Sequence, residues 1–214
     1  MRILFLTDSL GLPRDSPELV RFEECWIQIV KSNFPKFHFD QVSLGGATID
    51  VLFNQYDYHK QFEADLIILQ CGIVDCAPRA FKKFENALLN SNSLFRFISN
   101  KILNKKVINY LRKNRGIQKT SLTDFERYLS SFRDLNCKII TIEILPASID
   151  YELQLPGIMR NIEIYNQKLK KYFNTVELSN FEKGLVMSDF HHLNVVGNRE
   201  LARVINAKIF DFEK

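Results

Sequence analysis

Short apolar runs, set far apart and bounded by turn residues, constrain the fold of this chain more than any other feature of its sequence. The runs are rich in β-branched and aromatic residues, which is typical of strands. They lie at Ile3–Leu6, Phe37–Val42, Leu66–Leu69, Lys138–Ile144 and Thr175–Leu178. The first, third and fourth runs are apolar at consecutive positions, which indicates strands that are covered on both faces of a sheet.

Longer segments with helical periodicity separate these runs. We expect helices at Pro17–Asn33, Leu122–Leu135, Ile158–Phe173 and Val195–Phe210, and a further helix at Ser93–Lys113. Ser16 and Pro17 are predicted to be the N-cap and the first residue of the first helix. Strands that alternate with helices predict an α/β fold, here a three-layer α/β/α sandwich around a mainly parallel sheet of about five strands.

Length and composition fit one soluble domain that spans residues 1–214. Hydrophobic residues make up 46% of the chain and charged residues 25%. No apolar run approaches the length of about 18 residues that a transmembrane helix needs. The four cysteines show no CxxC spacing and are expected to be reduced thiols, which favours a cytoplasmic location. A core of this size needs no metal or disulfide to stabilise it.

Basic residues gather between Pro78 and Thr120. This segment holds eleven lysines and arginines and only one acidic residue, Glu85, so it carries a net charge of +10. The remainder of the chain carries −6, because the total is +4. We interpret the segment as a helical insertion at about 78–120, which is either a solvated surface face or a cap that meets an anionic ligand. Nucleic acid is not an expected partner, because no nucleic-acid motif accompanies the charge.

Polar and glycine residues follow three of the predicted strands at the points where the strands end. Ser9 comes just after the first strand, Gly45–Thr48 after the second and Gly72–Asp75 after the third. In an open α/β sheet, ligands bind beyond the carboxyl ends of the strands. We therefore expect these three loops to meet on one rim of the sheet.

Asp189 and His192 are three positions apart, just before the last predicted helix. A carboxylate at this spacing can orient an imidazole, which can then take a proton from a serine hydroxyl. Asn194 is a plausible cap of the helix, and Gly197 permits close packing. Adjacent histidines also suit a metal, but no cluster of cysteine, aspartate or glutamate with ligand spacing accompanies them, so no metal and no cofactor is predicted.

Taken together, these blocks resemble the SGNH hydrolases, also called GDSL esterases and lipases. The order along nearly the whole chain is Asp-Ser-Leu, Gly-x-Thr, Gly-x-x-Asp and Asp-x-x-His. The resemblance implies a flavodoxin-like sheet, Ser9 as the nucleophile, His192 as the general base and Asp189 as the group that orients it. It also implies that the backbone N–H groups of Ser9 and Gly46 form two arms of an oxyanion hole. The third block, GIVDCAPR, looks like a subset often found among bacterial surface-polysaccharide genes.

One position departs from the family pattern. The third block of the family normally reads Gly-x-Asn-Asp, and its asparagine supplies a third oxyanion donor, whereas Val74 stands here. Asp75 remains, and in the family it helps to brace the loop of the first block. Either two donors suffice, or another group such as Arg79 replaces the amide, or catalysis is lost. His191, beside His192, is a candidate for substrate contact.

Three functions follow from these residues. The first is an esterase that removes a small acyl group, such as acetyl, from a carbohydrate. The second is an O-acetyltransferase that uses the same triad and passes the acyl group to a sugar. The third is a binding module without catalytic activity, which uses the basic segment to hold an anionic glycan or partner.

Overall fold

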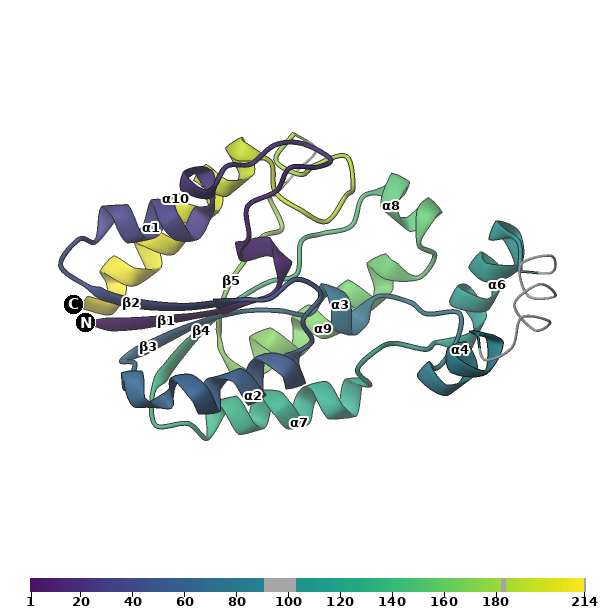
Figure 1. Ribbon diagram of the computed structural model, residues 1–214, viewed down its shortest axis with the longest axis horizontal. Coiled ribbons are helices and arrows are strands. Elements are labelled where there is room, and N and C mark those ends of the chain that lie inside the picture. The colour runs from purple at the N-terminus through teal and green to yellow at the C-terminus, as the bar shows by residue number, and fades with distance from the viewer. Residues whose placement is uncertain (91–102, 182–183, 214) are drawn as a thin grey trace.

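Five parallel strands form the centre of the protein. The structure is a computed structural model that describes residues 1–90, 103–181 and 184–213 (Figure 1). The strands are β1 (Arg2–Thr7), β2 (His38–Ser43), β3 (Leu66–Gln70), β4 (Lys138–Ile142) and β5 (Asn174–Val176). They pair in the order β2-β1-β3-β4-β5, and every pair is parallel. The sheet predicted from the five apolar runs is therefore confirmed.

Helices cover both faces of the sheet. The α-helices are α1 (Trp26–Asn33), α2 (Ile49–His59), α3 (Ile73–Cys76), α4 (Lys83–Asn90), α6 (Lys105–Arg115), α7 (Leu122–Arg133), α8 (Ile149–Gln154), α9 (Ile158–Tyr172) and α10 (Val195–Glu213). Helices α1 and α10 lie on one face, and α2, α7 and α9 lie on the other (Figure 1). This is the predicted three-layer α/β/α sandwich.

Strand β1 supplies side chains to both layers. Ile3 and Phe5 belong to the core cluster beneath α1 and α10, whereas Leu4 and Leu6 belong to the cluster beneath α2, α7 and α9. Successive side chains of a strand point to opposite faces, so a strand buried on both sides must be apolar at every position. This requirement explains the unbroken apolar run at the start of the sequence.

The prediction of a helix over Pro17–Asn33 is wrong in its first half, because α1 begins at Trp26. The backbone groups of Arg14 and Val20 exchange two hydrogen bonds of 2.9 and 2.8 Å, and Val20 is buried. Residues 14–20 therefore form a closed loop, which we call the 14–20 loop. Ser16 and Pro17 lie within this loop and do not start a helix. The predictions over Leu122–Leu135, Ile158–Phe173 and Val195–Phe210 agree with α7, α9 and α10 within three residues.

Helices α4 and α6 of the basic segment extend beyond the end of the sheet that carries the loops after the strands (Figure 1). An ion pair of 2.6 Å between Glu85 and Arg115 joins the two helices. The predicted helix Ser93–Lys113 is confirmed only for the part from Lys105 onward, and its earlier residues up to 102 lie outside the described ranges. None of the helices in the described ranges combines the length and the apolar character needed to cross a bilayer.

Candidate active site

Ser9 lies at the carboxyl end of β1, in the turn that follows Thr7. It begins the short 3-10 helix η1 (Ser9–Gly11). The buried Asp8 side chain caps this helix, because its Oδ1 accepts a hydrogen bond of 2.9 Å from the N–H of Leu10. A Cβ on Gly11 would lie 2.3 Å from the Thr7 hydroxyl oxygen, so only glycine allows this close approach. The turn thus holds Ser9 on the rim of the sheet.

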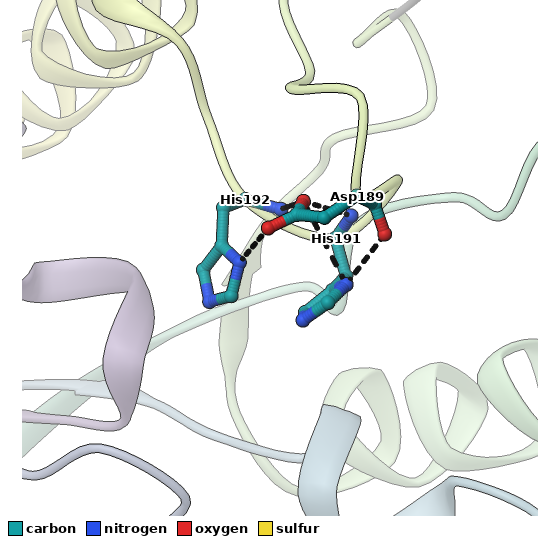
Figure 2. Close-up of side chains that lie close together, drawn as sticks. All are labelled: Asp189, His191 and His192. Atoms are coloured by element: carbon teal, nitrogen blue, oxygen red, sulfur yellow. Dashed lines mark hydrogen bonds and ion pairs between the residues drawn. The ribbon is translucent and has the colours of Figure 1, made fainter. Parts of the chain in front are cut away.

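Ser9, His192 and Asp189 form a continuous chain of hydrogen bonds. The Ser9 Oγ lies 2.9 Å from His192 Nε2, and His192 Nδ1 lies 2.7 Å from Asp189 Oδ2 (Figure 2). With the proton on Nδ1, the imidazole donates to Asp189 and its Nε2 can accept from the Ser9 hydroxyl. The other carboxylate oxygen of Asp189 accepts from the backbone N–H groups of His191 and His192 at 3.2 and 3.1 Å. The residues predicted as nucleophile, base and orienting acid therefore meet.

The surroundings of these groups favour a neutral imidazole beside an ionised carboxylate. Burial lowers the pKa of His192 below its ordinary value, although the hydrogen bond to Asp189 opposes this effect. Burial alone would raise the pKa of Asp189, but the hydrogen bond from His192 and the nearby His191 outweigh it and hold that pKa well below its usual range. A neutral imidazole hydrogen-bonded to a carboxylate is the form that accepts a proton from serine.

The loop before α10 is closed by its own backbone. The N–H of Met187 donates to the carbonyl oxygen of His192 at 2.7 Å, which fixes the turn that carries Asp189. The Asn194 side chain accepts from the N–H of Gly197 at 3.0 Å, so Asn194 caps α10 as predicted. The cap starts the helix directly after the candidate base and thereby sets its position.

The loop after β2 brings Gly46 to the same rim. Gly46 has φ of 71°, a conformation that favours glycine. The backbone N–H groups of Ser9 and Gly46 donate no hydrogen bond to any other described residue, so both remain available to a substrate oxygen. Lys119 Nζ donates to the carbonyl oxygen of Gly46 at 3.3 Å and holds the loop from its other side. Val74, in α3, offers only an apolar side chain.

Asp75 is buried behind the loop after β3. Its carboxylate accepts from the N–H of Ile49 at 3.1 Å and from the Thr120 hydroxyl at 2.5 Å, and its carbonyl oxygen accepts from the N–H of Lys119 at 3.2 Å. Burial raises the pKa of Asp75 to about 6, and these hydrogen bonds oppose the rise. The resemblance implied that Asp75 braces the first loop, but its described hydrogen bonds tie it to the start of α2 and to residues 119–120.

Arg79 and His191 occupy different surroundings on this side of the sheet. Arg79 is exposed, and its backbone N–H donates to the carbonyl oxygen of Ile117 at 2.7 Å. No contact in the described part of the chain joins its guanidinium to Ser9. His191 is half-buried and stacks on Tyr151, with ring centroids 5.8 Å apart and an angle of 13° between the rings. His191 therefore lies beside the candidate base with its side chain 33% exposed.

Sequence reasoning missed Arg14. Its guanidinium Nη2 lies directly against His192 Nε2, the same nitrogen that contacts Ser9. Arg14 comes five positions after Ser9, in a stretch that was predicted to lead into a helix. No motif marks this residue, because only the closure of the 14–20 loop brings its side chain back to the rim.

Asp189, His191 and His192 also have the composition of a metal site. One ligand atom from each lies within 4.8 Å of the others (Figure 2). Two of these side chains already belong to the hydrogen-bond chain that ends at Ser9, because His192 Nδ1 and Asp189 Oδ2 bond to each other. A metal bound here would therefore take the place of the hydrogen bond that orients the base.

No family sequence model and no curated protein sequence matches this chain. Solved structures do match it over nearly its full length. A lipase/acylhydrolase from Enterococcus faecalis has a TM-score of 0.66 at 13% sequence identity, and the match covers 97% of this chain and 94% of that chain. A member of the lipolytic G-D-S-L family from Veillonella parvula has a TM-score of 0.54 at 16% identity, with 95% and 94% covered. A catalytic mutant of an acetylxylan esterase from Geobacillus stearothermophilus has a TM-score of 0.58 at 14% identity, with 97% and 93% covered.

These likenesses establish the fold. The chain has the α/β/α architecture of the lipase/acylhydrolase and acetylxylan esterase structures, with five parallel strands and helices on both faces. The SGNH hydrolase type of fold that the sequence motifs implied is therefore confirmed.

Proposed function

We propose that the protein is a serine esterase of the SGNH type, which acts on a small acyl ester. The observation that carries this proposal is the hydrogen-bond chain from Ser9 through His192 to Asp189, built at the carboxyl end of a parallel sheet. The similar structures named as esterases and acylhydrolases support the same reaction class.

The geometry supports an acyl-enzyme mechanism. Ser9 Oγ attacks the carbonyl carbon of the ester while its proton passes to His192 Nε2, and Asp189 stabilises the imidazolium that forms. The N–H groups of Ser9 and Gly46 donate to the oxyanion of the tetrahedral intermediate. His192 then gives its proton to the leaving alcohol as the carbon–oxygen bond breaks. Water repeats the sequence on the acyl-enzyme and releases the acid.

The absence of an amide side chain at Val74 leaves this oxyanion hole with two backbone donors. Loss of one donor costs about 3 kcal/mol in the systems where it has been measured. The triad and the positioning of the substrate contribute independently. We therefore expect turnover, at a rate below that of a site with three donors.

We further propose that the acyl group is acetyl and that the alcohol belongs to a carbohydrate. Two of the similar structures are named as acetylxylan esterases, which supports a carbohydrate as the alcohol.

The basic segment offers room for the remainder of a glycan. A cavity of about 880 Å³ is lined by Arg79, Lys82 and Lys119, and Lys119 also contacts the loop of Gly46. A cavity of this charge next to the rim suits an anionic sugar chain. The residues around it are the ones that we expect to set substrate preference.

Substitution of the nucleophile tests the proposal. Ser9→Ala should abolish release of nitrophenol from a short-chain aryl acetate, and a fluorophosphonate probe should label the wild type at Ser9 only. Ser32→Ala, at an exposed serine of α1, is the matched control and should keep full activity. Equal turnover by wild type and Ser9→Ala would contradict the role of Ser9. An unlabelled Ser9 in a wild type without turnover would contradict the esterase and favour the binding module that Val74 suggests.

Acyl transfer is the second candidate function, because the same acyl-enzyme can be resolved by a sugar hydroxyl. Product analysis with an acyl donor and candidate glycans separates the two functions. Free acid as the sole acyl product would exclude transfer to the glycans supplied. An acetylated glycan that forms only with Ser9 present would assign the transferase.

A further inference from the structure

Arg14 contacts His192 Nε2, the nitrogen through which the proposed base would accept a proton. Its Nη2 lies against His192 Nε2, and the Ser9 Oγ lies 2.9 Å from the same atom. The Nδ1 side of the ring is already engaged with Asp189 at 2.7 Å, so Nε2 carries the one lone pair of the neutral ring. A guanidinium has only donors, and it therefore competes with the Ser9 hydroxyl for that lone pair.

The guanidinium of Arg14 has no direct counter-ion. In the described ranges, no carboxylate lies within 4.0 Å of it. The side chain is half-buried, and burial lowers its pKa, while the more distant charges of Asp189 and Asp8 oppose this effect. A partly desolvated guanidinium without a carboxylate has unused hydrogen-bonding capacity for an oxyanion group, which its planar donors can bind in pairs.

The backbone beneath Arg14 is fixed to the catalytic loop. Arg14 and Val20 exchange two backbone hydrogen bonds, and Val20 packs with Met187 in a small buried cluster. The Glu18 carboxylate accepts from the N–H of Ser188 at 3.0 Å. The 14–20 loop and the loop of His192 thus form one unit, so the guanidinium can change partners by rotating its own side chain.

The position of Arg14 also indicates which half of an ester it meets. In the proposed reaction His192 Nε2 gives its proton to the leaving alcohol, so the groups around Nε2 face the alcohol half. The oxyanion donors, the N–H groups of Ser9 and Gly46, face the carbonyl oxygen instead. An anionic group that reaches Arg14 would therefore belong to the alcohol.

We propose that Arg14 selects esters whose alcohol half carries a carboxylate or phosphate, and that binding of this anion draws the guanidinium away from His192 Nε2. The lone pair of Nε2 then becomes available to the Ser9 hydroxyl. Without an anion, Arg14 competes with the Ser9 hydroxyl for this lone pair and lowers the rate. This inference rests on the proposed esterase and adds the charge of its substrate and a residue that determines specificity.

Three acetylated sugars test the proposal: an acetylated hexuronic acid, an acetylated hexose phosphate and the neutral acetylated hexose. We expect wild-type kcat/KM to favour at least one anionic sugar over the neutral one by about tenfold or more, which is the scale of one charge-assisted pair. Comparison of the carboxylate and the phosphate identifies which anion fits. Arg14→Gln should lose this preference, and its kcat/KM on the neutral sugar should rise, because no guanidinium then competes with the Ser9 hydroxyl for His192 Nε2.

Two controls separate this role from a structural one. Arg199→Gln removes a positive charge from the exposed face of α10 and should leave the preference intact. Arg14→Gln should also raise the apparent pKa of the acidic limb of the pH–rate profile on the neutral ester, because the Arg14 charge lowers the pKa of His192. A role in folding alone would not move that limb.

The failures are distinguishable. Equal loss on all three sugars in Arg14→Gln, or a preference that survives the substitution, would overturn the role of Arg14 while the esterase stands. A wild type that hydrolyses all three sugars equally would also overturn the role of Arg14 and leave the esterase intact. If wild type hydrolyses none of them and Ser9 resists the fluorophosphonate probe, the proposed function itself falls, and this inference falls with it.

Discussion

Asp8, the neighbour of Ser9, carries a carboxyl group that is fully buried. Burial raises its pKa to about 7, even though hydrogen bonds with the Leu10 N–H and the Gln70 side chain oppose the rise. Asp8 Oδ2 and Gln70 Oε1 are both buried, and neither oxygen has a hydrogen-bond donor among the described residues. Protonation of Asp8 adds a hydrogen-bond donor to its own carboxyl group, which the ionised carboxylate lacks.

The raised pKa makes folding stability depend on pH. Asp8 rises from 3.8 to about 7, and each pKa unit is worth 1.36 kcal/mol, so ionised Asp8 costs the folded state about 4 kcal/mol at pH 8. The folded protein binds more protons than the unfolded chain between these two values. The contribution of Asp8 to the free energy of unfolding is therefore fully present below about pH 4, and it is lost as the pH rises through about 7.

Asp8→Asn should remove this cost. The asparagine keeps an oxygen that can accept from the N–H of Leu10, and it is uncharged at every pH. We expect the variant to exceed wild type in free energy of unfolding by about 2 kcal/mol at pH 5 and about 4 kcal/mol at pH 8. Titration of groups that do not interact with Asp8 affects both proteins alike and cancels in the difference.

Urea unfolding at pH 5, 6, 7 and 8 measures the difference. Asp15→Asn, at an exposed carboxylate of the 14–20 loop, is the matched control, and its curves should stay close to wild type at every pH. A stability difference between Asp8→Asn and wild type that stays constant from pH 5 to 8 would refute the reasoning. Such a result would mean that Asp8 is ionised in the folded protein throughout this range.

Two further predictions concern the base and the last helix. The kcat/KM for a neutral aryl acetate should rise with pH through the pKa of His192. The midpoint of this rise should lie below the ordinary value of 6.5, because burial disfavours the imidazolium. A midpoint above 6.5 would contradict this prediction. Gly197→Ala would place a Cβ 2.1 Å from the carbonyl oxygen of Leu185, so the backbone must move, and urea unfolding should show a loss of about 2 kcal/mol. An unchanged unfolding midpoint would argue against this contact.

Much of the fold could be predicted because buried parallel strands leave a strong pattern. Unbroken apolar runs located β1, β3 and β4 within about two residues, and turn residues marked their ends. Helix α2 left a weaker pattern, since only Ile49 and Leu52 are fully buried, and it was not predicted. Its start is fixed instead by the hydrogen bond between Asp75 and the N–H of Ile49, a tertiary contact that local periodicity does not reveal.

Some residues of the candidate site could also be predicted from the sequence, whereas others could not. Ser9, Gly46 and the pair Asp189 and His192 follow strand ends or precede a helix, so the topology alone predicts that they meet. Arg14 could not be found by this reasoning, because its place depends on the closure of an irregular loop. The Ser16–Pro17 pair, a common start for a helix, lies inside that loop and led to the wrong prediction there.

Ser9 and His192 are 183 positions apart in the chain, with strands β2 to β5 between them. At a synthesis rate of about 5–20 residues per second, roughly ten to forty seconds pass between the appearance of Ser9 and that of His192. Strands β1, β2 and β3 can pair in that interval, but the serine still has no base. In the proposed mechanism, a growing chain therefore carries an unactivated Ser9, and the reaction becomes possible only after α10 has docked beside α1.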